Sequence, residues 1–306
     1  MSFKINLNKN SQKEIAFFIV FGALLVFIFS FSSLSNRYLK GESLNENITS
    51  FEEDLKNVKA LSFLVGDLEN QKVILEKNKN LHLYPASISK LVLAMVVIDE
   101  LPLEKEIYIS SYALSAEGEE GGLKEGEAFK VIDLLKVLLI SSSNDAALAF
   151  EEEFRNQGKD IIDLMNRKVQ QIGLEQTAIF DPRGIDRKGN FSTASDLFLL
   201  AKEIYYHYPL IGEITRKEKE VVFSLDGVEH QLVNTNLLTG KIKELWGGKT
   251  GTTPEAGDCL LTFYEIFKEG SGQKIPIVII VLSSSQRFED TQILYDYFKN
   301  YYLKNL

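Results

Sequence analysis

The chain has 306 residues, of which 45% are hydrophobic and 25% are charged, and its formal net charge is −9. This length is enough for one large globular domain with its own core, and the composition excludes an intrinsically disordered protein. The acidic balance argues against a nucleic-acid partner, because phosphate contacts need clustered Lys and Arg side chains.

The first predicted element is an apolar helix near the N-terminus. Residues 15–34 contain no charged side chain, and their number is close to the roughly 20 residues that span a bilayer as a helix. Lys4, Lys9 and Lys13 precede this run, which predicts a cytoplasmic N-terminus and an extracytoplasmic catalytic body. The alternative is a cleaved signal peptide, but no convincing small-x-small cleavage site follows the run.

These features predict a single-pass protein of the cell membrane, held there by its N-terminal helix. We expect a cytoplasmic tail at residues 1–14, a transmembrane anchor at 15–34 and a polar tether at 35–50. The folded domain is then expected to occupy residues 51–306.

The folded domain is predicted to begin and end with β-strands. A hairpin is expected where a polar turn separates ALSFLVGDLEN from QKVILEKN, and a second where KEGSGQ separates CLLTFYEIF from KIPIVIIVLSS. Residues 87–101 are apolar nearly all round and predict a buried helix. Residues 130–150 have a second helical pattern, broken by the serine run 141–143, and TQILYDYFKNYY predicts a final helix. Strands at both ends with helices between them indicate an α+β fold, with an antiparallel sheet packed against helices and a helical subdomain.

Three short motifs follow one another in this domain. Residues 87–90 read S-x-x-K, residues 142–144 read S-x-N, and residues 249–251 read K-T-G, followed by Thr252. Each motif alone has an ordinary structural explanation: a helix cap with an exposed lysine, a helix break, and a glycine-rich turn entering a strand. Their joint occurrence in this order is a strong signal for nucleophilic chemistry at a serine.

Ser87 and Lys90 are the predicted nucleophile and base. They are three positions apart and therefore share one face of a helix. A serine hydroxyl is a poor nucleophile without an adjacent base, and a lysine is a base only when its amine is neutral. Burial in an apolar helix lowers the pKa of Lys90, and a second cation nearby, for which Lys249 is the candidate, lowers it further. The N–H groups at the helix N-terminus suit a developing oxyanion.

The motifs and their surroundings resemble the low-molecular-mass penicillin-binding proteins, the serine D-alanyl-D-alanine carboxypeptidases and endopeptidases. The similarity covers about residues 55–304 and includes LYPASISKLVLA, GGLKEGEAFKVIDLLKVLLISSSNDAALA, NFSTASDLFLLAKE, VNTNLL, WGGKTGTTPEAGDCLL and SSQRFEDTQILYDYF. The resemblance implies the fold of the penicillin-binding protein and β-lactamase superfamily. Its implied partners are a peptidoglycan stem peptide as substrate and β-lactam antibiotics as inhibitors.

The resemblance also implies roles for the motif residues. Ser87 would attack the carbonyl between two D-alanines, with Lys90 as general base and Ser142 as proton relay. Backbone N–H groups of Ser87 and Thr252 would form the oxyanion hole. The residues implied in substrate binding are Asn144, Lys249, Thr250, Gly251, Thr252 and Arg287. Arg287 follows the last strand, where a surface arginine is the simpler interpretation.

Several alternatives stay open within and beside this family. Residues 181–184 read D-P-R-G where the family often has N-P-H-G, which leaves the substrate preference of this loop open. A carboxypeptidase is not distinguished from an endopeptidase or a weak transpeptidase. A β-lactamase would need a further base, and the near match at residues 152–156 lies close to Asn144 and is continuous with a helix. A non-catalytic peptidoglycan-binding protein is disfavoured by the three intact motifs.

Other polar residues are predicted to be structural. His82, His207 and His230 lack the spacing of metal ligands, so the sequence predicts no metal site and no cofactor. Cys259 is the only cysteine, which excludes an intramolecular disulfide, and its apolar surroundings predict an inert thiol buried in a strand. Residues 151–153, three consecutive glutamates, are expected to form a solvated helix face.

Overall fold

The computed structural model describes residues 53–119, 121–268 and 272–305. The chain divides into two compact units, Met1–Asp54 and Leu55–Leu306, with a boundary close to the predicted domain start at residue 51. The predicted tail, transmembrane anchor and tether lie outside the described residues. Within the described ranges, no helix combines the length and apolar character needed to cross a bilayer.

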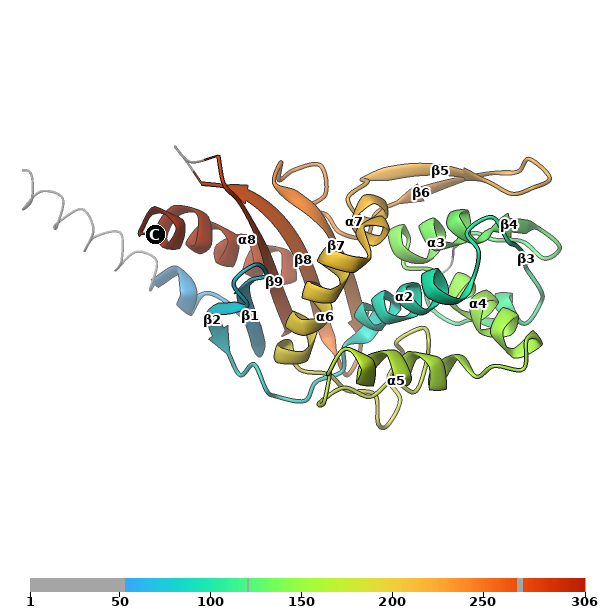
Figure 1. Ribbon diagram of the computed structural model, residues 1–306, viewed down its shortest axis with the longest axis horizontal. Helices are drawn as coiled ribbons and strands as arrows, with labels where there is room; N and C mark the ends of the chain where they lie inside the picture. Colours follow the sequence, from blue (N-terminus) through green and yellow to red (C-terminus); the bar gives the residue numbers. More distant parts are fainter. Residues whose placement is uncertain (1–52, 120, 269–271, 306) are drawn as a thin grey trace, which may run out of the picture. The chain divides into compact units, whose positions relative to one another are not determined.

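The centre of the Leu55–Leu306 unit is an antiparallel sheet with the strand order β2-β1-β9-β8-β7 (Figure 1). Both predicted hairpins are confirmed: β1 (Ser62–Asp67) pairs with β2 (Lys72–Lys77), and β8 (Gly257–Phe267) pairs with β9 (Lys274–Ser284). β1 also pairs with β9, so strands from the two ends of the domain lie side by side. β7 (Leu245–Thr253) forms one edge of the sheet.

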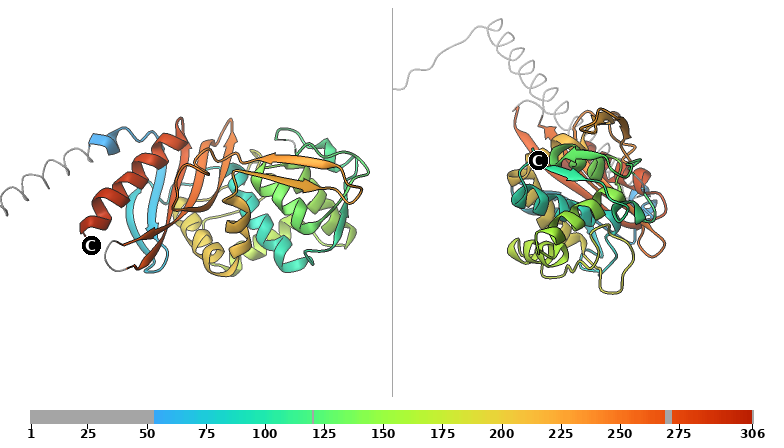
Figure 2. Two further views of the ribbon diagram at one scale, coloured as in Figure 1. Left: turned by 90° about the horizontal axis from the view of Figure 1, so that it is seen from above. Right: turned by 90° about the vertical axis from the view of Figure 1, so that its right-hand side faces the viewer.

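Both faces of this sheet are buried. Side chains alternate between the faces because a strand has a period of two. On β9, Ile277 and Ile279 belong to the apolar cluster that contains Leu294 of α8 (Arg287–Asp296), whereas Val278 and Ile280 belong to the cluster that contains the other helices. Figure 2 shows the sheet between α8 on one side and α6 on the other. Burial on both faces explains why β9 is apolar without alternation.

The remaining helices form the predicted helical subdomain and its connection to the sheet. α2 is buried on all sides from Lys90 to Val97, as its apolar sequence predicts. α6 packs on β1 and β9, and α7 packs on β7. The helices are the short η1 (Ala86–Ser89) and η2 (Ala113–Ser115), α2 (Lys90–Glu100), α3 (Val131–Ile140), α4 (Asn144–Asn156), α5 (Ile161–Gln171), α6 (Ala194–His207) and α7 (Pro209–Thr215).

Smaller elements complete the fold. Two hairpins accompany the helical subdomain: β3 (Glu106–Tyr108) with β4 (Ala128–Lys130), and β5 (Lys219–Phe223) with β6 (Glu229–Val233). The predicted final helix is α8, which continues through the wider π-helical turn of η3 (Tyr297–Tyr302) and the tighter 3-10 turn of η4 (Leu303–Asn305). The α+β fold with its antiparallel sheet from both ends is therefore confirmed.

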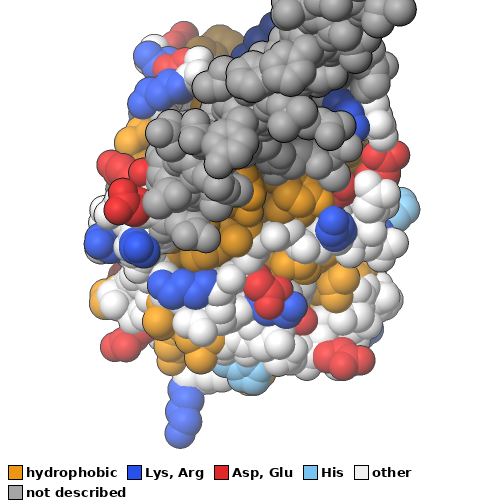
Figure 3. All heavy atoms as spheres, turned by 90° about the vertical axis from the view of Figure 1, so that its left-hand side faces the viewer, with side chains coloured by type: hydrophobic (Ala, Val, Ile, Leu, Met, Phe, Trp, Pro, Cys, Tyr) orange, Lys and Arg blue, Asp and Glu red, His pale blue; other side chains and the backbone are white. Residues whose placement is uncertain are grey.

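Charged groups of both signs are distributed over the surface. On the face shown in Figure 3, Lys and Arg side chains are interspersed with Asp and Glu side chains and with hydrophobic ones.

Candidate active site

Ser87 lies where the sheet meets the helical subdomain, because η1 contacts the edge strand β7 and leads directly into α2. Lys90 is the first residue of α2, and its Nζ donates a hydrogen bond to Ser87 Oγ at 2.8 Å. The Lys90 side chain is completely buried. Burial lowers the pKa of Lys90 well below its usual range, and the positive charge of Lys249 lowers this pKa further. The direction of this shift is the one expected from the sequence for a second lysine near Lys90.

Two further acceptors surround the Lys90 amine. Its Nζ donates to Oδ1 of Asn144 at 2.7 Å and to the carbonyl oxygen of Arg183 at 2.6 Å. The amide of Asn144 is itself held in this orientation, since its Nδ2 donates to the carbonyl of Glu117 at 2.7 Å. Asn144 thus holds the Lys90 amine in a fixed orientation.

The serine run 141–143 separates α3 from α4, as predicted. Ser143 is the N-cap of α4 and accepts a hydrogen bond from the N–H of Ala146 at 2.9 Å. Ser142 has φ +61°, a left-handed conformation that is uncommon for residues other than glycine. This turn brings Ser142 to Lys249, whose Nζ donates to Ser142 Oγ at 2.7 Å.

Lys249 is the second buried cation of the site. Its Nζ also donates to the carbonyl of Thr250 at 2.9 Å. Burial lowers the pKa of Lys249 to about 7; the negative charge of Glu119 opposes this effect, and the positive charge of Arg287 adds to it. Near neutral pH, Lys249 therefore exchanges between a charged and a neutral form.

β7 runs close to Ser87 because residue 251 is a glycine. A Cβ on Gly251 would lie 2.7 Å from the Ser87 backbone nitrogen, closer than non-bonded atoms approach. The N–H of Gly248 points away from β8, since it donates to Thr215 Oγ1 at 3.1 Å. By the period of two, the N–H of Thr252 lies on this same free edge of the sheet. The predicted pairing of the Ser87 and Thr252 N–H groups at an oxyanion fits this arrangement.

Arg287 lies beside Thr252 rather than on the open surface. Its Nη1 donates to Thr252 Oγ1, to the carbonyl of Gly251 at 3.0 Å and to Asp258 Oδ1 at 3.1 Å. The Arg287 side chain is 15% exposed, so the simpler interpretation as a surface arginine is wrong. Asp258 offsets part of its charge, and it also accepts from Thr252 Oγ1 at 2.8 Å.

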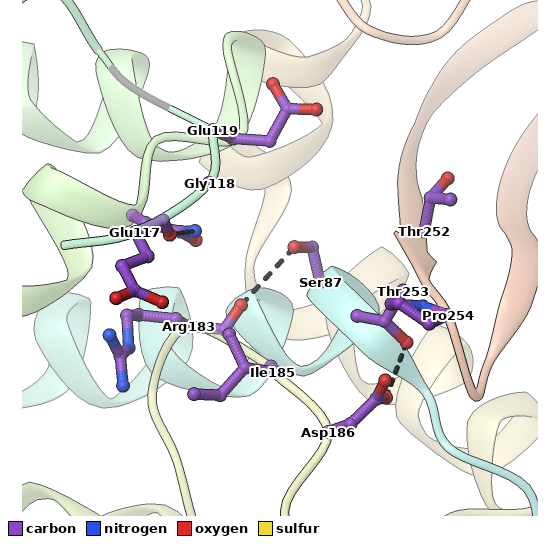
Figure 4. A pocket seen from close by; sticks show the side chains of 12 residues that line it. Ser87, Glu117, Gly118, Glu119, Arg183, Ile185, Asp186, Thr252, Thr253 and Pro254 are labelled. Carbon is purple, nitrogen blue, oxygen red and sulfur yellow. Dashed lines mark hydrogen bonds between the residues drawn. The ribbon is translucent and has the colours of Figure 1, made fainter.

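A cavity of about 730 Å³ opens over Ser87. In Figure 4, Ser87 lies between Glu117–Glu119 on one side and Thr252–Pro254 on the other, with Arg183–Asp186 below. Asn144 also lines this cavity. The nucleophile thus faces a space large enough for a short peptide, as an acyl-transfer site requires.

Some contributors to the site carry no sequence motif. Arg183 and Glu117 act through backbone carbonyls, so their side-chain types gave no signal. Thr235, in the segment VNTNLL, hydrogen-bonds the hydroxyl of Thr250. Asp186 accepts from Thr253 Oγ1 and links the cavity wall to β7. Of these residues, only Thr235 lies in one of the family-like segments, and Arg183 lies in the D-P-R-G loop noted above.

The histidines lie away from Ser87 or are paired with other groups. His82 stacks on Phe191 with ring centroids 4.7 Å apart, and His230 Nε2 lies 3.1 Å from the buried carboxylate of Glu127. Among the described residues, no group of three His, Cys, Asp or Glu side chains is arranged to hold a metal ion.

Two structural predictions have different outcomes. Cys259 is fully buried in β8, so its predicted burial in a strand is confirmed, and burial raises the pKa of its thiol to about 11. The expected solvated face at residues 151–153 is wrong, because these glutamates are only partly exposed and have partners. Glu152 accepts from Ser110, and Glu153 pairs with Lys105 at 2.7 Å.

Taken together, a serine held by a buried lysine, an asparagine on that lysine and a second lysine on a sheet edge define a serine acyl-transfer site with a lysine base. A model of the D-alanyl-D-alanine carboxypeptidase family matches residues 48–282. This chain belongs to that family.

Two curated relatives illustrate the similarity. The chain is 30% identical over 233 residues to the D-alanyl-D-alanine carboxypeptidase DacF of Bacillus subtilis, which covers 74% of this chain and 59% of that relative. It is 34% identical over 208 residues to a D-alanyl-D-alanine endopeptidase of Escherichia coli, which covers 65% of each protein. The matched part of the chain therefore spans about three fifths of the Bacillus relative.

Solved structures show the same fold. A D-alanyl-D-alanine carboxypeptidase from Mycobacterium tuberculosis has a TM-score of 0.70 and 26% identity, covering 78% of this chain and 90% of that one. A penicillin-binding protein from Listeria monocytogenes, solved in its ampicillin-bound form, has a TM-score of 0.65 and 30% identity, covering 78% and 97%. The predicted resemblance to penicillin-binding proteins is confirmed.

Proposed function

We propose that this protein is a serine D-alanyl-D-alanine carboxypeptidase that trims peptidoglycan stem peptides through an acyl-enzyme on Ser87. The observation that carries this proposal is the buried Lys90 amine 2.8 Å from Ser87 Oγ, which supplies the base that a serine nucleophile needs. Family membership and the names of the relatives support the substrate class. The reaction needs only side chains, backbone N–H groups and water.

Acylation begins when Ser87 Oγ attacks the carbonyl carbon of the terminal peptide bond and its proton passes to Lys90. The oxyanion that forms accepts hydrogen bonds from the N–H groups of Ser87 and Thr252. The C–N bond then breaks, and a proton reaches the leaving amine through Ser142. Because the Ser142 hydroxyl accepts from Lys249 at 2.7 Å, it directs its own proton away from that lysine. D-Alanine leaves, and the stem peptide remains as an ester on Ser87.

Deacylation repeats these steps with water as the nucleophile. Water attacks the ester carbonyl, Lys90 takes the proton of the water, and the proton then returns to Ser87 Oγ as the stem peptide leaves. The substrate carboxylate is negative, so we assign it to the side of the cleft where Arg287 contacts Thr252 and where β7 also carries Lys249.

A D,D-endopeptidase is the second candidate, because the relatives from Escherichia coli and Pseudomonas aeruginosa, at 34% and 32% identity, carry that name. Both reactions attack a D-alanyl carbonyl and differ in the amine that leaves. A β-lactamase is less well supported: α4 runs unbroken from Asn144 to Asn156, so the near match at residues 152–156 lies on a helix.

The test combines two substrates with a labelling reagent. Mass spectrometry of a defined pentapeptide should show the loss of one D-alanine, whereas cleavage of a cross-linked dimer would indicate the endopeptidase. Fluorescent penicillin should label wild type and Ser89→Ala, a control at the neighbouring serine of the same motif, but not Ser87→Ala. Equal labelling of Ser87→Ala would remove Ser87 from the mechanism, and rapid turnover of a chromogenic cephalosporin would favour the β-lactamase.

We also propose that residues 15–34 anchor the protein in the cell membrane, with the catalytic body outside the cytoplasm. The charge-free run and the preceding Lys4, Lys9 and Lys13 support this topology. N-terminal sequencing of the cell-associated protein should then begin at residue 1 or 2. A start near residue 35 would contradict an uncleaved anchor.

A further inference from the structure

We propose that Asp181 is a positioning residue for the acyl-transfer reaction: it fixes the backbone carbonyl of Arg183, which together with Asn144 aims the Lys90 amine at Ser87. This inference rests on the proposed function and adds a residue to its machinery. Asp181 does not line the cavity over Ser87 and makes no hydrogen bond to Ser87 or Lys90; its contacts reach them through Arg183. Beyond the larger effect of burial, the opposite charges of Asp181 and Arg183 also shift the pKa of Lys90 in opposite directions.

The geometry around Lys90 shows why the Arg183 carbonyl matters. A neutral amine has two N–H groups and one lone pair in a tetrahedral arrangement. Asn144 Oδ1 at 2.7 Å and the Arg183 carbonyl at 2.6 Å can only accept, so they take the two N–H groups. The third neighbour is Ser87 Oγ at 2.8 Å, to which a charged amine donates its third N–H. In the neutral amine that position holds the lone pair, which can accept the proton of Ser87. Without either acceptor, the rotatable amine can turn its lone pair away from the serine.

Asp181 holds Arg183 at both its backbone and its side chain. Oδ1 of Asp181 accepts from the Arg183 backbone N–H at 2.9 Å and from Nε at 3.0 Å, and Oδ2 accepts from Nη2 at 2.8 Å. The Asp181 side chain is 3% exposed and the Arg183 side chain 14% exposed, so water competes little for these bonds. A charge-assisted, two-pronged contact of this kind fixes orientation as well as distance. The carbonyl of Arg183 therefore has little freedom to rotate.

Gly184, the next residue in this loop, packs closely against η1, the short helix that contains Ser87. Gly184 has φ +82°, and a Cβ there would lie 2.2 Å from the carbonyl oxygen of Ala86 in η1. The Arg183 carbonyl is thus fixed on one side by Asp181 and on the other by close packing on η1. Asp181 and Arg183 are also the two positions at which this loop departs from the family's common N-P-H-G.

A matched control comes from Arg187, which also contacts Asp181. Its Nε lies 3.4 Å from Asp181 Oδ2, and its side chain is 57% exposed. Arg187 carries the same charge as Arg183, but no hydrogen bond joins it to Lys90 or Ser87 among the described contacts. Its removal changes the charge near Asp181 without releasing the Arg183 carbonyl.

The test measures acylation of the full-length protein by a chromogenic cephalosporin in stopped flow, which separates the affinity of the first complex from the acylation rate constant. Asp181→Asn and Arg183→Ala are expected to lower the rate constant by about tenfold or more, because small misplacements at a reacting centre are costly. The affinity is expected to change less than about twofold, since neither side chain lines the predicted carboxylate position. Arg183→Lys keeps the positive charge but not the two-pronged guanidinium contact with Asp181, so it should give an intermediate rate constant. Arg187→Ala should give a rate constant within about twofold of wild type.

The outcomes separate this inference from the proposed function. A wild-type rate constant in both Asp181→Asn and Arg183→Ala would overturn the positioning role, and so would an equal loss in Arg187→Ala. Thermal unfolding of each variant identifies any that fails to fold. If Asp181→Asn fails to fold, the rate constant of Arg183→Ala, which keeps the backbone carbonyl, decides the test. Failure of the wild type to be acylated, or acylation of Ser87→Ala, would instead overturn the proposed function.

Discussion

Replacement of Lys249 by methionine is expected to stabilise the protein, and to do so more at pH 6 than at pH 9. Lys249 is 1% exposed, and burial lowers the pKa of its amine to about 7, with Glu119 opposing and Arg287 adding to the effect. Methionine fills similar space without a charge, so the variant removes the free-energy cost of burying the ammonium group. The same change should weaken binding of the substrate carboxylate.

The magnitude follows from the two pKa values of Lys249. In the unfolded chain the amine keeps its proton up to its ordinary pKa of 10.5, whereas in the folded protein it releases the proton near pH 7. Between these values the unfolded state binds more protons, so the stability of the wild type rises with pH. Two pH units above 7 correspond to about 2.7 kcal/mol. Lys90 adds an effect of the same sign, since the charge of Lys249 lowers its pKa in the wild type only.

Urea unfolding, followed by the fluorescence of Trp246, the only tryptophan, measures this difference. The advantage of Lys249→Met over wild type should shrink by about 2–3 kcal/mol between pH 6 and pH 9. Lys219→Met, at an exposed position of β5, is the control and should show no such change. An advantage that is equal at both pH values would refute the reasoning, because it would mean that the folded protein does not lower the pKa of Lys249.

Three further predictions test other parts of the structure. Gly251→Ala would place a Cβ 2.7 Å from the Ser87 nitrogen, so acylation by penicillin should fall about tenfold or more; a near-normal rate would show that β7 can move aside. Cys259, which is fully buried with its pKa raised to about 11, should resist a thiol-exchange reagent at pH 8 until urea is added; rapid reaction of the native protein would contradict its burial. Asp290→Ala removes the acceptor for the N–H groups of Lys59 and Ala60 and should lower the free energy of unfolding by about 2–4 kcal/mol in urea titrations, whereas a loss below about 0.5 kcal/mol would argue against the contact.

The parts of the fold that correspond to clear apolar segments were predictable from the sequence. The apolar runs of β8 and β9, the uniformly apolar α2 and the break between α3 and α4 each have one physical interpretation, and each is present. The convergence of Ser87, Lys90, Asn144 and Lys249 was also predictable, because only a joint function explains three motifs in that order.

Other parts had no comparable signal. The K-T-G motif lies within the regular strand β7 rather than in a turn before it. Gly251 allows a close contact with η1, and the preceding Gly247 allows one with Thr215, so neither glycine serves a reversal of the chain. Arg183 and Glu117 contact Lys90 and Asn144 through backbone carbonyls, which every residue type has, so residue type does not reveal these contacts. Residues 151–153 were misjudged because their partners, Ser110 and Lys105, come from a distant loop.

The motif segments come from elements that are far apart in the chain: η1 and α2, the turn before α4, and the edge strand β7. None of these segments contains the site alone, and the Ser87–Lys90 pair acquires its buried surroundings only when the sheet edge and the helical subdomain are both in place. Under the proposed function, covalent labelling of Ser87 by penicillin would therefore report only those molecules in which the site is correctly assembled. In partly denaturing urea, or in a crude cell extract where spectroscopy fails, the labelled fraction would measure the folded population of this protein directly.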